Sequence, residues 1–211
     1  MKEGESMETT IYLIRHGETL WNRERRIQGH RDVPLSEAGL EQARRLGKHL
    51  RGIHFHGVYA SDLQRAVQTA EQVAAGRNLS VHTLPSLRER HLGEWEGLSL
   101  ESLKKHYPED WQRVWNQGGE YGVEPTENIR VRMMAALDGI CREHPGKRAA
   151  VVSHGGSINI VLESVSDGRY GPGRTRIGNT AVSILVYHPE SGWRVEEVNR
   201  GEHLESERAR S

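Results

Sequence analysis

The chain has 211 residues, with 29 basic and 29 acidic side chains and therefore no formal net charge at neutral pH. This length suits one domain with a sizeable core. The balanced charge gives no reason to expect bulk binding to nucleic acid or to an anionic membrane. The one cysteine, Cys141, excludes an intramolecular disulfide, fits a reducing cytoplasmic setting and lies in a helical pattern that predicts a core position.

Apolar runs alternate with helical patterns along the chain. In order, the periodicities predict strand 11–14, helix 36–50, strand 58–60, helix 62–75, strand 80–84, helix 126–142, strand 149–152, helix 157–165 and a hairpin of 180–187 with 193–198. Ser36 and Thr126 stand at the expected N-caps of two of these helices. The alternation predicts an α/β fold, a three-layer α/β/α sandwich around a mostly parallel sheet.

Three segments fall outside this pattern. Residues 1–9 are polar and acidic without an apolar signal segment, so we expect a disordered leader in which Met7 is a candidate alternative start. Residues 205–211 are charged and are expected to fray. Residues 98–125 mix aromatic residues with glycines and predict an insertion of one or two short helices and a loop over the site, whose aromatics favour packing over ligand contact. No stretch approaches the ~20 apolar residues of a membrane span.

Polar residues follow three of the predicted strands directly: Arg15-His16, Ser61, and Ser153-His154. If these strands are parallel neighbours, their ends share the edge of the sheet where ligands bind in open α/β folds. Arg65 lies one turn into the helix after the second strand and can return to that edge. Two arginines and two histidines would then surround one point, which suits a phosphoryl group, and Gly17 would let the backbone approach it closely.

Several motifs occur together and in a fixed order. They are Arg15-His16-Gly17-Glu18-Thr19 with Trp21-Asn22, Arg26-Ile27-Gln28-Gly29, Ser61-Asp62-Leu63-Gln64-Arg65-Ala66, Leu87-Arg88-Glu89, Gly93-Glu94-Trp95-Glu96-Gly97 and Val152-Ser153-His154-Gly155. On these motifs the sequence resembles the histidine phosphatase superfamily, the phosphoglycerate-mutase-like enzymes, over nearly its whole length.

The residue types and the resemblance together imply a mechanism. His16 would attack phosphorus and become a phosphohistidine, while Arg15, Arg65 and His154 would hold the phosphoryl oxygens. The resemblance places Glu89 as general acid and then general base. Further phosphate contacts are expected from Asn22, Gln28 and Gly155. No metal or other cofactor is expected, because the arginines and a protonated histidine would supply the positive charge.

Each assignment has a plainer alternative. Arg65 could be a solvated charge on a helix, His154 a core histidine, and Glu89 a member of a surface ion-pair cluster with Arg88 and Arg90. His54 and His56 have metal-ligand spacing but no acidic or cysteine partner nearby in the sequence. Gly155-Gly156 lacks the lysine and the spacing of a P-loop.

Three functions remain open at this point. The mutase pattern has a tyrosine after Glu-Arg-His, a lysine beyond it and an Arg-Arg pair in the insertion; here Leu92 replaces the tyrosine, and the lysine and the pair are missing. This favours a metal-independent phosphomonoester hydrolase acting on small phosphorylated metabolites. A cofactor-dependent phosphoglycerate mutase and a non-catalytic binding module are the alternatives. Val123-Glu124-Pro125-Thr126 stands where many members of the family have Gly-Gly-Glu-Ser, so the substrate preference stays open. The sequence also leaves the oligomeric state open.

Overall fold

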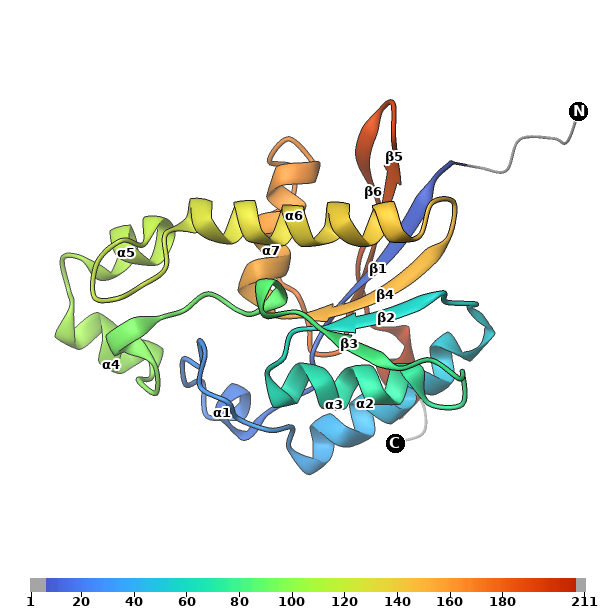
Figure 1. Ribbon diagram of the computed structural model, residues 1–211. Coiled ribbons are helices and arrows are strands. Elements are labelled where there is room, and N and C mark those ends of the chain that lie inside the picture. The colour runs from blue at the N-terminus through green and yellow to red at the C-terminus, as the bar shows by residue number, and fades with distance from the viewer. Residues whose placement is uncertain (1–6, 208–211) are drawn as a thin grey trace, which may run out of the picture.

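A six-stranded sheet forms the centre of the computed structural model, which describes residues 7–207 (Figure 1). Its strands, in the order β3-β2-β4-β1-β5-β6, are β3 (Val81–Thr83), β2 (Gly57–Ala60), β4 (Arg148–Ser153), β1 (Thr9–Arg15), β5 (Val182–His188) and β6 (Gly192–Arg200). The first four are parallel, and β5 is antiparallel to both of its neighbours. The predicted mostly parallel sheet and the final hairpin are confirmed.

Helices cover both faces of the sheet, as the predicted sandwich requires. On one face lie α2 (Glu37–His49) and α3 (Gln64–Ala74), and on the other lie α6 (Thr126–Glu143) and α7 (Gly155–Val165) (Figure 1). Strand side chains alternate between the two cores. Ile11 and Leu13 pack with α6 and α7, whereas Ile14 packs with α2 and α3. Cys141 is buried in the α6 core, as predicted.

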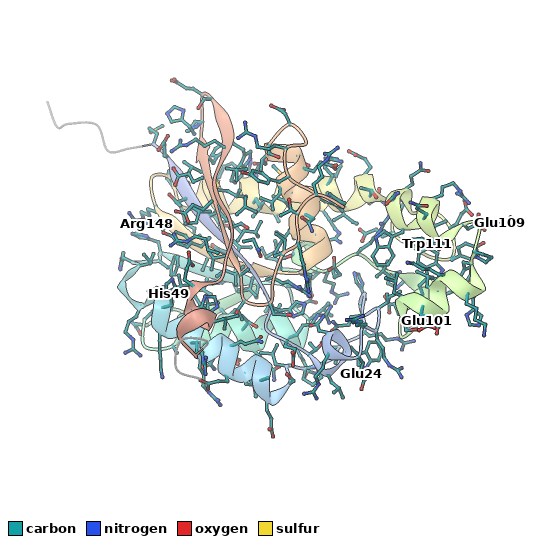
Figure 2. The ribbon with its side chains drawn as sticks, turned by 180° about the vertical axis from the view of Figure 1, so that it is seen from behind. Glu24, His49, Glu101, Glu109, Trp111 and Arg148 are labelled. Atoms are coloured by element: carbon teal, nitrogen blue, oxygen red, sulfur yellow. The ribbon has the colours of Figure 1, made fainter. Side chains whose placement is uncertain are left out.

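The insertion forms a lobe of its own with a separate small core. Its helices α4 (Leu100–His106) and α5 (Trp111–Gln117) pack around the fully buried Trp95. Trp111 marks this lobe, at the end of the molecule away from Arg148 (Figure 2). The predicted packing role holds for most of its aromatics, but Trp115 is 40% exposed. The remaining short helices are α1 (Leu20–Arg23) and the 3₁₀ turns η1 (Leu50–Gly52), η2 (Pro85–Leu87), η3 (Gly93–Trp95) and η4 (Glu202–Glu207).

One of the two predicted helix caps is confirmed and the other is wrong. The Ser36 hydroxyl accepts a hydrogen bond from Gly39 N at 3.0 Å, which caps α2. Thr126 is instead the first residue of α6, and Pro125 precedes it without a side-chain cap. The Thr126 hydroxyl donates to Asn116 O at 2.6 Å. This hydrogen bond therefore joins the insertion to α6, and the hydroxyl does not cap the start of the helix.

The predicted disordered segments at both ends extend into residues that form secondary structure. Strand β1 already begins at Thr9, whose hydroxyl donates to His144 O at 2.9 Å, so the leader prediction is wrong there. Residues 205–207 belong to the 3₁₀ turn η4 rather than to a frayed tail. The predictions for residues 1–6 and 208–211 lie outside the described residues. Across residues 7–207, none of the helices combines the length and apolar character that crossing a membrane requires.

Candidate active site

The polar ends of three strands meet at one edge of the sheet because β2, β4 and β1 are parallel neighbours. Val152 lies opposite both Ile14 and Ala60, so the residues that follow these strands emerge side by side. A hydrogen bond of 3.0 Å from His16 N to Ser153 O continues the pairing beyond the strands. The predicted convergence of the strand ends is thus present in the fold.

A cavity of about 870 Å³ opens at this edge. Most of the predicted site residues line it, namely Arg15, His16, Asn22, Gln28, Arg65, Glu89 and Gly155. His154 is fully buried next to them, with its ring centre 5.1 Å from that of His16. Trp115 and Asn116 of the insertion also form part of the wall.

His16 is held as a neutral imidazole with one nitrogen available. Its Nδ1 lies 2.7 Å from Gly17 O. A carbonyl only accepts, so Nδ1 carries the proton and Nε2 keeps its lone pair. Burial, reinforced by the charges of Arg65 and Arg15, holds the pKa of His16 well below its usual range. The side chain is therefore an uncharged imidazole with an available lone pair at neutral pH.

His154 is the complementary case, a neutral donor. Arg65 Nε donates to His154 Nδ1 at 3.2 Å, so Nε2 must carry the proton. Burial and then the charge of Arg65 keep the pKa of His154 well below its usual range. The expectation of a protonated histidine was therefore wrong, because a ring this deep beside a guanidinium stays neutral. Within residues 7–207, His154 Nε2 is buried without a hydrogen-bond partner.

Arg65 is a buried structural centre of the site rather than a solvated charge. It is 1% exposed, and its terminal nitrogens donate to Arg31 O and Gly29 O, both at 2.8 Å. Burial lowers its pKa to about 10, which leaves it charged at neutral pH. The guanidinium therefore fixes both the 29–31 loop and the His154 ring.

Arg15 completes the positive surroundings of His16. One terminal nitrogen donates to Ile177 O at 2.6 Å, while its Nε is buried without a partner among the described residues. This Nε lies against Gly155, where an added Cβ would be only 3.3 Å away. Two buried N–H groups, on Arg15 and His154, thus have no partner among the described residues. Buried donors of this kind are normally satisfied, so both groups have hydrogen-bonding capacity to spare.

Glu89 faces the same cavity and is not part of an ion-pair cluster. Arg88 pairs with Asp62 instead, at 2.6 Å, and the Arg90 guanidinium donates to Glu124 O at 2.7 Å. The Glu89 carboxylate accepts from Gly156 N and Ser157 N, both at 3.0 Å, at the start of α7. Gly156 allows this close approach, because a Cβ there would lie 2.7 Å from Oε1 and the carboxylate would have to shift.

Asn22 and Gln28 form the polar side of the cavity, and Asn179, which the sequence did not reveal, supports it from outside the wall. Asn22 Oδ1 accepts from Thr19 N at 3.1 Å, and Gln28 Oε1 accepts from the Thr19 hydroxyl at 3.0 Å, which leaves the amide nitrogens of both side chains as donors. Asn179 donates to His16 O at 3.1 Å and to Asn22 Oδ1 at 3.3 Å. Its only signal in the sequence is the Gly178-Asn179 pair, a common turn sequence.

Two further arginines, Arg174 and Arg176, line the cavity from the loop before β5. Sequence reasoning did not find them because they belong to no motif. Among the described residues no three histidine, cysteine or acidic side chains are grouped so that they could hold a metal ion. The rings of His54 and His56 lie 4.6 Å apart, but within residues 7–207 these two side chains belong to no group of three potential metal ligands.

The fold and the site together define an α/β protein with an arginine-lined cavity around a neutral histidine at the carboxyl edge of its sheet. The family profile of the histidine phosphatase superfamily (branch 1) matches residues 11–201. The chain belongs to this superfamily.

Its relatives carry both phosphatase and mutase names. "Uncharacterized phosphatase PhoE" of Bacillus subtilis is 31% identical, over 93% of this chain and 97% of the relative. "Probable phosphoglycerate mutase GpmB" of Enterobacter is 35% identical, over 93% and 95%. The structure is also similar to a phosphoserine phosphatase of Entamoeba histolytica in complex with 3-phosphoglyceric acid, with a TM-score of 0.79, 26% identity and coverage of 93% and 99%.

Proposed function

We propose that this protein is a metal-independent phosphomonoester hydrolase that works through a phosphohistidine on His16. One observation carries the proposal: His16 is neutral and buried with its Nε2 free, in a cavity whose wall includes Arg15 and Arg65. The His154 ring lies 5.1 Å away, and its Nε2–H has no partner among residues 7–207. A nucleophile and unsatisfied donors for phosphoryl oxygens are the two parts that covalent phosphoryl transfer needs.

In the first step the His16 Nε2 lone pair attacks phosphorus, and the bond from phosphorus to the ester oxygen breaks. The departing oxygen keeps the electron pair and takes a proton from Glu89, which acts as general acid. Arg15, Arg65 and His154 stabilise the negative charge on the phosphoryl oxygens. The leaving alcohol can then diffuse out of the cavity.

In the second step a water molecule attacks the phosphohistidine. Glu89, now a carboxylate, takes a proton from that water, and the bond from phosphorus to nitrogen breaks with its electron pair returning to His16 Nε2. Inorganic phosphate and the original enzyme result. The position of the Glu89 carboxylate on the cavity wall supports both roles.

The walls of the cavity favour hydrolysis over mutase chemistry. Leu92 lines the wall at the position where the mutase pattern has a tyrosine. The Arg90 guanidinium already donates hydrogen bonds to Glu124 O, Trp115 O and the Thr126 hydroxyl. A mutase remains the second candidate because Arg174 and Arg176 could hold a second anionic group. The volume of about 870 Å³ supports a small phosphorylated metabolite as substrate.

Trapping the intermediate tests the proposal. Wild-type protein mixed with a labelled phosphomonoester and quenched in alkali should retain covalent phosphate that acid then releases, whereas His16→Ala should retain none and should lose turnover. Turnover should survive excess EDTA. Interconversion of 2- and 3-phosphoglycerate that depends on 2,3-bisphosphoglycerate, without net phosphate release, would support the mutase instead. Phosphate binding by wild type without any turnover would support a binding module.

A further inference from the structure

The segment that carries Glu89 has no regular secondary structure, yet side chains from other elements bind several of its carbonyl groups. Residues 88–91 lie between the 3₁₀ turns η2 and η3. Side chains from elsewhere bind four successive carbonyls: Ser86 O from Arg132 at 2.9 Å, Leu87 O from Ser153 at 2.8 Å, Arg88 O from Arg132 at 2.7 Å and Glu89 O from Arg132 at 3.0 Å. Arg132 supplies three of these bonds. Ser157 Oγ also donates to Arg88 O at 2.8 Å, and His30 Nε2 lies 2.8 Å from Glu89 O.

Arg132 uses its whole donor set here. Its other two N–H groups form a bidentate pair with Glu124, at 2.8 Å from Nε to Oε1 and 2.9 Å from Nη2 to Oε2. All five guanidinium donors therefore have acceptors. The side chains are only 20% and 16% exposed, so the pair is largely shielded from water.

Glu124 holds the other side of the same segment. Its carboxylate accepts from His91 N at 3.2 Å, and its own backbone N donates to His91 O at 2.8 Å. Arg132 thus binds the chain up to Glu89, and its ion-pair partner binds the chain two residues later. Glu89 lies between the two attachments, with its carboxylate fixed at the start of α7.

We propose that Arg132 and Glu124 are a positioning pair that aims the Glu89 carboxyl group at the leaving-group side of the cavity. This inference rests on the proposed function, in which Glu89 is the general acid. A carboxyl group on an irregular segment keeps a fixed place only if its backbone is held, and a misplacement of about 1 Å can cost on the order of 100-fold in rate.

Arginine is needed for this role because of its geometry. Lysine has three donors on one nitrogen and no planar fork, so it cannot serve three carbonyls and a bidentate carboxylate together. Arg132→Lys should therefore keep the charge but loosen the backbone of residues 86–89, which would retain only the contacts of Ser153, Ser157 and His30. Glu124→Gln offers a second, milder variant, since it keeps the side-chain size but replaces one acceptor oxygen by a donor that faces the Arg132 fork.

The experiment measures kcat/KM on phosphate esters whose leaving groups range from p-nitrophenol to a simple alcohol. Arg132→Lys should lose about 10- to 100-fold on the alkyl phosphate and less than about threefold on p-nitrophenyl phosphate, and Glu124→Gln should show the same pattern more weakly. Arg142→Lys is the matched control. Arg142 is exposed in the last turn of the same helix and does not line the cavity, so this variant should leave both rates unchanged.

The leaving-group dependence separates positioning from simple loss of folded protein. A fall by the same factor on every ester, or no fall for either variant, would overturn the positioning role. Glu89→Gln is measured alongside as the reference for a lost general acid. If Glu89→Gln shows no leaving-group dependence, or wild type hydrolyses none of the esters, the proposed function itself fails and the positioning role fails with it.

Discussion

Gly156→Ala probes how closely the active site is packed around Glu89. The added Cβ would lie 2.7 Å from Glu89 Oε1, 3.2 Å from Cδ and 3.3 Å from Oε2. Ordinary contact begins near 3.4 Å, so the carboxylate has to retreat by about 0.7 Å at Oε1. Its hydrogen bonds to Gly156 N and Ser157 N, now 3.0 Å long, would not survive a retreat directly away from α7.

The expected cost falls on catalysis rather than on stability. A shift of this size in a general acid should reduce kcat/KM for an alkyl phosphate by about 10- to 100-fold. The loss should be much smaller on p-nitrophenyl phosphate, whose leaving group scarcely needs a proton. Replacing glycine by alanine in a helix favours the helix by up to about 1 kcal/mol, which offsets part of the crowding. The midpoint of thermal unfolding should therefore change little.

The assay compares the two substrates in parallel with thermal unfolding. Gly139→Ala in α6 is the matched control, because the nearest atom to its added Cβ is Arg142 Nη2 at 3.9 Å. That variant should keep full activity. Unchanged alkyl phosphate hydrolysis by Gly156→Ala would refute the reasoning, since it would show that the Glu89 carboxylate can leave the start of α7 without consequence.

Two further predictions concern protons. Glu89→Gln should reduce the turnover of an alkyl phosphate by about 10²–10⁴-fold. On p-nitrophenyl phosphate it should still release a rapid burst of p-nitrophenol, because only the later hydrolysis of the phosphohistidine needs the base. Equal losses of turnover on both substrates, without a burst, would contradict a general acid. Burial lowers the pKa of His203 to about 4. Between about pH 6.5 and pH 4 the unfolded chain therefore carries a proton on this residue that the native protein lacks. The free energy of unfolding falls as the pH drops through that range. In urea unfolding, His203→Gln should reduce this fall by on the order of 1 kcal/mol per pH unit, and an unchanged slope would contradict the argument.

The convergence of Arg15, His16, Arg65 and His154 was predictable because topology determines it. Three apolar runs end directly at these residues or shortly before them, and parallel neighbouring strands end at the same edge of a sheet. The sequence also predicted the two faces of the sheet, since helix and strand periods mark the apolar positions. These features depend on local pattern plus one assumption about strand order.

The supports of the site were not predictable in the same way. Asn179 binds His16 O, and Arg132 binds the carbonyls around Glu89, through contacts between side chains and backbone that are distant in the sequence. Such contacts leave no periodicity. The N-cap prediction for Thr126 was wrong for a related reason. A hydroxyl at the start of a helical pattern resembles an N-cap, but here the Thr126 hydroxyl donates its hydrogen bond to the distant carbonyl of Asn116.

The strand order has a consequence for how the chain folds. Strand β1 is made before the other strands of the sheet, yet its two neighbours are β4 (Arg148–Ser153) and β5 (Val182–His188), the fourth and fifth strands along the chain. Until then, both edges of β1 and its apolar residues Ile11, Leu13 and Ile14 lack their native cover. Pairings across such long sequence separations form slowly. The nascent chain should therefore pass through a long interval of aggregation risk, and His16 should gain its surroundings only after β4 and β5 have been made.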